Sequence, residues 1–220
     1  GNVCIGKDAG DSISTESNCI LIGIDAGQNI QGTDADKTIA IGYFAGRLMT
    51  TGLENTAIGS QSMDLMGGAA ADYNTAVGYE TMMSSGTAGN NDGANNAAFG
   101  HKALKQLTDG TNNVAVGSAA MTTNVLGDNN IAIGYGAMDL SYIDDTQDAL
   151  TDDNIFIGKD SGGGDWATAA SFSNVAIGNL TMDGILNGAL NNTAVGHNAL
   201  TDLTVGDSNT AVGMGAGDSI

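Results

Sequence analysis

The chain contains no proline, and only 6 of its 220 residues are lysine or arginine. Aromatic residues make up 5% of the chain, too few for an ordinary mixed globule of this length. Because the 6 bases face 25 acids, the formal charge is −19, and such a field repels nucleic-acid phosphates and anionic membranes. We therefore expect no nucleic acid and no anionic membrane among the partners of this protein.

Long apolar runs are also missing, and cysteine is rare. The longest apolar run covers residues 20–24, which is far too short to cross a bilayer, so we expect no membrane insertion. The 2 cysteines, Cys4 and Cys19, fall at different positions of a repeat. On stacked parallel strands this offset separates their Cα atoms by roughly 8 Å, beyond the usual disulfide reach of about 7 Å. We expect both to be small buried side chains that form no disulfide.

What the chain has in abundance is one short unit, of which residues 192–196 (Asn-Thr-Ala-Val-Gly) are an example. The unit recurs twelve times, at spacings of 17 to 24 residues, and each copy ends at a glycine. These glycines are Gly6, Gly23, Gly42, Gly59, Gly78, Gly100, Gly117, Gly134, Gly158, Gly178, Gly196 and Gly213. A fixed unit with slightly variable spacers predicts a solenoid in which each repeat forms one rung.

Counting each rung from its glycine as position 0 exposes regular columns. Position −1 is always large and apolar and mostly β-branched, as expected of a buried strand position, and position −2 is alanine in nine of the twelve rungs. Neighbouring strand residues face opposite sides of a sheet, so these two columns point in opposite directions. A face open to water would vary, and the alanine column therefore predicts a face covered by another chain or by a second layer.

Position −4 is asparagine in ten of the twelve rungs, and stacked asparagines form hydrogen-bonded ladders. We predict such a ladder from Asn55, Asn74, Asn113, Asn130, Asn192 and Asn209. Small residues at position +3 and an apolar anchor near position +7, as at Ile185, complete the rung. Helical periodicity is absent, so we expect two short strands per rung joined by turns rich in glycine, aspartate and asparagine.

The sequence thus predicts an all-β protein, a parallel β-solenoid of about twelve rungs of 17–24 residues. At about 4.8 Å per rung the rod is of the order of 55 Å long. One array occupies residues 1–220, and both ends fall within a repeat, so we expect a segment of a longer protein or a subunit that stacks on its neighbours. A single chain has a thin core, which favours a homotrimer.

Three units carry a resemblance to known families: residues 74–79 (Asn-Thr-Ala-Val-Gly-Tyr), 130–138 and 192–200. They resemble the NTAxGxxAL-type repeat region of bacteriophage tail fibres and spikes. They are also similar to the heads of trimeric autotransporter adhesins, whose Ala-Ile-Gly repeats wind into a left-handed parallel β-roll. The resemblance implies a left-handed, trimeric, extracellular rod. The spacing of 17 residues or more is longer than in adhesin heads and favours the fibre group.

Catalytic parts are not apparent in the sequence, and we expect no enzyme. The 2 histidines, His101 and His197, both occupy position +1, and no serine, cysteine or carboxylate is expected beside them in register. Two other kinds of site stay open. Insertions at 139–153 and 163–173 carry Tyr142, Trp166 and Phe172, which either stack on a cell-surface glycan or fold back over a rung.

The second candidate is a metal-binding site. The acidic cluster Asp144, Asp145, Asp148, Asp152 and Asp153 is a candidate for calcium, the one cofactor that we consider, although aspartate is also an ordinary turn residue that keeps a repetitive surface soluble. Together these features favour a structural or adhesive fibre segment on a virion surface or in the extracellular space. The alternative is the head of a bacterial surface adhesin or a subunit of a self-assembling extracellular filament.

Overall fold

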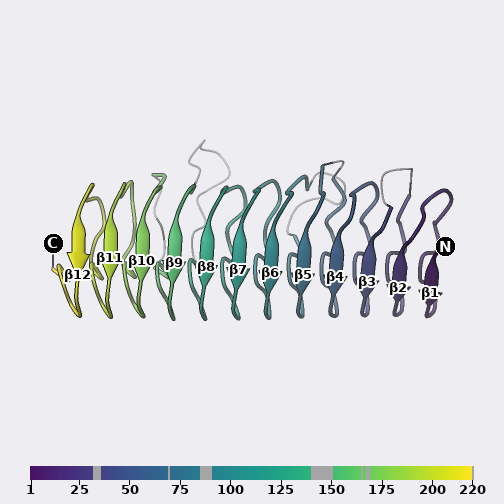
Figure 1. The fold of residues 1–220 in the computed structure, drawn as a ribbon, viewed down its shortest axis with the longest axis horizontal. Coiled ribbons are helices and arrows are strands. Elements are labelled where there is room, and N and C mark those ends of the chain that lie inside the picture. The colour runs from purple at the N-terminus through teal and green to yellow at the C-terminus, as the bar shows by residue number, and fades with distance from the viewer. Residues whose placement is uncertain are drawn as a thin grey trace.

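A computed structural model describes residues 1–31, 36–68, 70–84, 91–139, 151–164, 166 and 169–219. Twelve parallel strands of three residues each form one sheet, in which every strand pairs with the next one in sequence. The rungs follow one another in a row from the N-terminus to the C-terminus (Figure 1). The strands are β1 (Val3–Ile5), β2 (Ile20–Ile22), β3 (Ile39–Ile41), β4 (Thr56–Ile58), β5 (Thr75–Val77), β6 (Ala97–Phe99), β7 (Val114–Val116), β8 (Ile131–Ile133), β9 (Ile155–Ile157), β10 (Val175–Ile177), β11 (Thr193–Val195) and β12 (Thr210–Val212).

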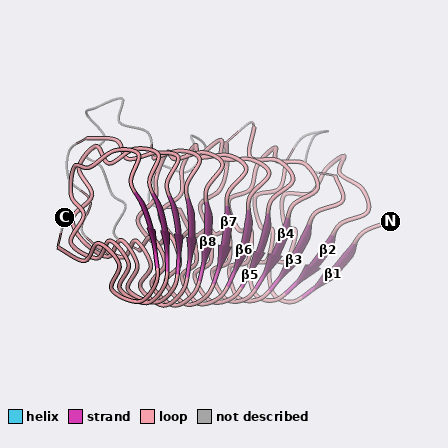
Figure 2. Ribbon diagram, turned by 60° about the vertical axis from the view of Figure 1, so that its left-hand side comes forward, coloured by secondary structure: helices cyan, strands magenta, loops and turns pink. Residues whose placement is uncertain are grey.

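The strands pair so that equivalent positions of successive repeats lie side by side. In every pair equal positions face each other, as Ala115 of β7 faces Ala132 of β8. We call the turn of the coil that carries β1 rung 1, and so on to rung 12. All twelve strands lie along one side of the coil, and turns and loops form the rest of it (Figure 2). The predicted parallel β-solenoid is therefore confirmed.

Position 0 is glycine because no other residue fits there. The twelve glycines have φ between 129° and 143°, a region that L side chains rarely adopt. At Gly117 a Cβ atom would also overlap the backbone carbonyl of Gly134 in the next rung, and the same overlap recurs along the column. The close stacking of these glycines lets the chain leave the strand and turn at the same place in every rung.

Only one strand per rung is found in the described residues, so the prediction of two was wrong. Beyond the glycine the backbone alternates into the left-handed region, as at Ala119 (φ 59°) and Met121 (φ 51°) of rung 7. These dihedral angles interrupt a strand, yet hydrogen bonds between rungs continue through the turn. The Met121 N–H, for example, donates to the carbonyl of Ala137 at 2.9 Å.

The alanine column lies inside the coil of a single chain, which corrects the expectation that it packs between chains. Ala115 and Ala132 are completely buried, and the side chains that cover them are methionine or leucine from position +4, such as Met121 and Met138. The interior is so narrow that a large side chain from the turn leaves room for only a methyl group on the strand. The apolar anchor of rung 10 is also corrected, because Leu186 is buried and Ile185 is exposed.

The asparagine column forms a continuous ladder from rung 4 to rung 12. The side-chain oxygen of each asparagine accepts the backbone N–H of the next, as Asn113 does from Asn130 at 2.9 Å. The side-chain amide then donates across the coil, as Asn130 does to the carbonyl of Thr151 at 2.6 Å. The hydrogen bonds include the six predicted members and add Asn96, Asn154 and Asn174.

Cys4 and Cys19 form no disulfide with each other. Cys19 is buried as expected, whereas Cys4 is exposed because rung 1 has no neighbour on its outer side in the described chain. Within the described part of the chain, no helix is long and apolar enough to cross a membrane.

Candidate functional site

The outer face of the sheet is the most distinctive surface of the molecule. Because position −2 points inward, positions −3 and −1 point outward, and each strand therefore presents two side chains to the outside. Most of these are isoleucine or valine, half-buried or exposed. Val116 and Ile133, for instance, keep 37% and 38% of their surface. A strand of three residues with its middle residue inside thus places large apolar groups on the surface.

No charged residue occupies either outward column in any of the twelve rungs. The only polar side chains there are four threonines, Thr56, Thr75, Thr193 and Thr210. Three strand residues by twelve rungs give a footprint of roughly 10 Å by 55–60 Å, or about 600 Å². That value reaches the upper end of the range for the largest apolar patch of a soluble monomer, which is roughly 300–600 Å² and marks interaction sites.

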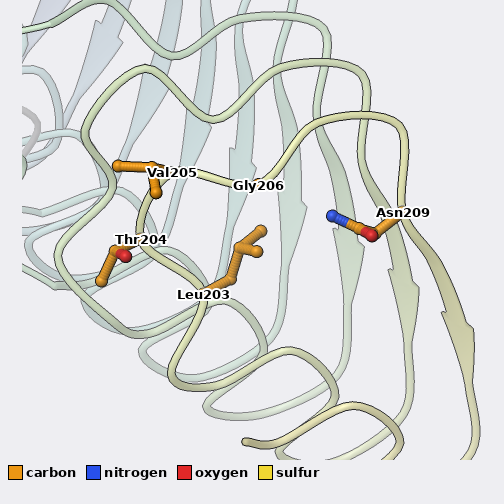
Figure 3. Close-up of a pocket in the computed structure, with 5 residues that line it drawn as sticks. All are labelled: Leu203, Thr204, Val205, Gly206 and Asn209. Carbon is orange, nitrogen blue, oxygen red and sulfur yellow. The ribbon is translucent and has the colours of Figure 1, made fainter. Parts of the chain in front are cut away.

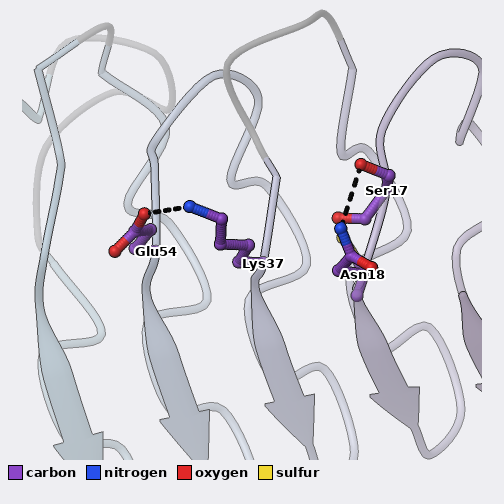
Figure 4. A network of polar contacts seen from close by, with 5 residues as sticks. Ser17, Asn18, Lys37 and Glu54 are labelled. Atoms are coloured by element: carbon purple, nitrogen blue, oxygen red, sulfur yellow. Dashed lines mark hydrogen bonds and ion pairs between the residues drawn. The ribbon is translucent and has the colours of Figure 1, made fainter. Parts of the chain in front are cut away.

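Charged side chains appear directly beside this face. At position −5, before the strands begin, Lys37 of rung 3 forms an ion pair with Glu54 of rung 4 at 2.5 Å (Figure 4). In the preceding rung the side-chain amide of Asn18 donates to the Ser17 hydroxyl at 3.3 Å. The apolar face therefore has a polar rim along one of its long edges.

Position +1 lies along the other edge and carries exposed aromatic residues. The rings of Tyr79 and His101 stack with centroids 5.6 Å apart, and His101 Nδ1 lies 3.5 Å from the Ser118 hydroxyl of the next rung. The expectation that no serine lies beside a histidine was therefore wrong, since neighbouring rungs bring members of one column together. Tyr79 and His101 are exposed and Ser118 is half-buried, and a 3.5 Å contact is at the limit of a hydrogen bond.

The predicted glycan residues do not form a solvent-facing platform around Trp166. This side chain is 4% exposed, its indole N–H donates to the Gly162 carbonyl at 3.0 Å, and its ring meets Phe156 edge-on at 5.6 Å. Trp166 thus belongs to the core, which agrees with the alternative that the insertion folds back over a rung. Phe172 is exposed, and Tyr142 lies outside the described residues.

The acidic residues that the structure describes serve the turns. Asp152 accepts the backbone N–H of Asp128 at 2.8 Å, and Asp128 in turn accepts that of Thr111 at 2.6 Å. Burial raises the pKa of the Asp152 carboxyl, with the charges of Asp128 and Asp153 acting in the same direction. Across the described ranges, no three histidine, cysteine, aspartate or glutamate side chains are placed to hold a metal ion. The candidate calcium ligands Asp144, Asp145 and Asp148 lie outside those ranges.

A cavity of about 260 Å³ lies at the last rungs and is lined by Leu203, Thr204, Val205, Gly206 and Asn209 (Figure 3). In earlier rungs the backbone of the following rung covers the equivalent glycine, as the Gly127 carbonyl covers Gly110. Among the described residues, no backbone carbonyl of a following rung covers Gly206 in this way. The cavity is therefore the interior of the coil seen at its end, and it shows no arrangement of polar groups specific for a ligand.

No family model, no curated protein and no solved structure matches this chain. The geometry alone defines it as a parallel β-solenoid repeat protein. Among the described residues, the apolar outer face of the sheet is the one extended and nearly uniform surface.

Proposed function

We propose that this chain is a segment of an extracellular fibre whose copies associate side by side through the outer face of the sheet. The segment spaces a binding tip away from a particle or contacts a host surface, as in a phage tail fibre. The observation that carries the proposal is the apolar, charge-free face that runs along all twelve rungs. The repeat's resemblance to fibre proteins favours the virion surface and an assembly of three copies.

The area of the face supports self-association. Its footprint of about 600 Å², widened by the polar rim and the position +1 column, approaches the roughly 800 Å² per partner of a standard stable interface. The strands are also nearly uniform along the rod, so a second copy meets a similar surface at almost every height. A partner of different shape has no comparable match over this length.

The charge distribution supports the same conclusion. Copies that each carry a formal charge of −19 repel one another, and they associate only where the acids stay outside the contact. The outward columns meet this condition, because none of their residues is charged. Since salt screens the remaining repulsion, association through this face strengthens as ionic strength rises.

Sedimentation velocity with a pair of matched variants tests the proposal. Val116→Lys with Ile133→Lys places two charges on the outer face of neighbouring strands, at residues that are already partly exposed. Ile185→Lys with Val205→Lys adds the same charge at two exposed aliphatic residues outside the sheet. We expect the first pair to release folded monomers and the second to leave the oligomer intact. A wild-type chain that sediments as a folded monomer at high salt refutes the proposal.

A further inference from the structure

Strand β6 breaks the uniformity of the outer face. It presents Ala97 at position −3 and Phe99 at position −1, whereas every other strand has a β-branched residue at both positions. Phe99 is 43% exposed, so its ring stands out from the sheet. One rung in the middle of the rod therefore carries the smallest and the largest outward side chains together.

The neighbouring rungs make Ala97 the floor of a notch. Along the rod it lies between Thr75 and Val114, and Phe99 lies between Val77 and Val116. All four neighbours are larger than alanine and smaller than phenylalanine. The outer face thus has a hollow and a projection at the same height, two residues apart on one strand.

Symmetry brings these two features together in an assembly of parallel copies. The strands run across the rod, so rotation about an axis parallel to the rod sets position −1 of one copy against position −3 of the next, at equal height. We infer that Phe99 of each copy packs into the Ala97 notch of its neighbour and fixes the axial register of the assembly. This inference rests on the proposed function.

The assembly needs a distinctive contact to fix its axial register, because the remaining outward positions are nearly uniform along the rod. A shift by one rung elsewhere exchanges isoleucine, valine and threonine for one another, which are similar in shape. The same shift at β6 sets Phe99 against Thr75 or Val114 of the neighbour, and it leaves the Ala97 notch only partly filled by Val77 or Val116. Overfilled and empty sites both weaken a packed contact. Rung 6 therefore discriminates between registers that the other rungs accept almost equally.

A double-mutant cycle on the association constant tests the inference. Ala97→Val fills the notch, Phe99→Val removes the projection, and the double variant gives β6 the Val-Ala-Val sequence of β7. Sedimentation equilibrium gives the association constant of each variant. We expect each single change to lower it by about tenfold and the double change to bring it back to within about threefold of wild type, as coupled contacts do.

Two further readouts separate the possible outcomes. Thermal melting of each variant, at a dilution where the chain is monomeric, reports packing of Phe99 on its own chain. If the two substitutions are coupled in the melting temperature of the monomer, the inference is overturned. It is also overturned if their effects on the association constant are independent. Either result leaves the proposed function intact. A wild-type chain that does not associate overturns both.

A cross-linking experiment then locates the contact. In a Cys4→Ser background, which removes the exposed native thiol, Ala97→Cys and Phe99→Cys chains are refolded together and treated with a short bis-maleimide. We expect linked pairs that contain one chain of each kind. Products formed equally well by Phe99→Cys chains alone contradict the placement.

Discussion

Phe156 and Gly162 share one volume inside rung 9. A Cβ atom on Gly162 would lie 2.5 Å from Phe156 Cε1, so the phenylalanine ring occupies the space that a side chain at position 162 needs. Rung 8 has the reverse arrangement, with Ala132 on the strand and Met138 in the turn, both buried. Rungs 8 and 9 thus each fill their interior with one large and one small residue at positions −2 and +4, in opposite order.

The first prediction concerns a variant of rung 9 in which the large residue moves from position −2 to position +4. Phe156→Ala leaves a cavity and costs about 3–5 kcal/mol, and Gly162→Met alone overfills the site. The double variant copies the pairing of rung 8, where Met138 adopts φ 51°, close to the φ of 61° at Gly162. We expect it to recover most of the loss in the free energy of unfolding, measured by urea denaturation. If the losses in the free energy of unfolding of the two single variants add up in the double variant, the two residues do not share a volume.

Much of this fold was predictable because it repeats. The position of every strand, the parallel register and the asparagine ladder follow from aligned columns, since stacked rungs place equal residues beside each other. The direction of the columns was not predictable from size. Large residues such as Ile133 were expected inside, but the turn brings Met138 into the coil, and only Ala132 fits beneath it.

The candidate site was predicted less well than the fold. The insertions carry the exceptions to the repeat, and the placement of Trp166 depends on how the loop closes over Phe156, which no column encodes. The signal for the outer face was present in the sequence. Position −3 and position −1 lack charge in every rung, and alternation places both on the side opposite Ala132 and its equivalents.

The asparagine ladder yields a second prediction. Asn130→Ala removes the oxygen that accepts the backbone N–H and the side-chain amide of Asn154, and it removes a donor to the Thr151 carbonyl, all inside the coil. Each buried group left without a partner costs about 1–3 kcal/mol, so we expect the free energy of unfolding to fall by several kcal/mol. Asn129→Gly is the control, because Asn129 is exposed and its φ of 58° suits glycine. Equal losses in the two variants would count against a structural role for the ladder.

The third prediction concerns pH. Burial raises the pKa of Asp139 and of Asp183, and the nearby charge of Asp160 adds to both shifts. A carboxyl with a raised pKa binds its proton more tightly in the folded state, so folding becomes more favourable as pH falls from the raised pKa toward the ordinary value of about 3.9. We expect the melting temperature to rise as pH is lowered from 7 into this window.

Two variants check the origin of that rise. Asp139→Asn with Asp183→Asn removes both groups and should flatten the dependence. Glu80→Gln should steepen it, because hydrogen bonds from Lys105 and Tyr79 lower the pKa of Glu80 and its contribution is lost on acidification. A melting temperature that falls steadily from pH 7, or variants that parallel the wild type, would contradict the assignment.

The mass per unit length of the assembled rod tests side-by-side association most directly, because stacking end to end leaves it unchanged. One chain of 22.0 kDa spread over twelve rungs of about 4.8 Å gives about 0.4 kDa per Å. Scanning transmission electron microscopy of unstained rods measures this quantity. Lateral association predicts a whole multiple of the single-chain value, about 1.2 kDa per Å for three copies. A value of about 0.4 kDa per Å at high salt would show that the outer face of the sheet stays open.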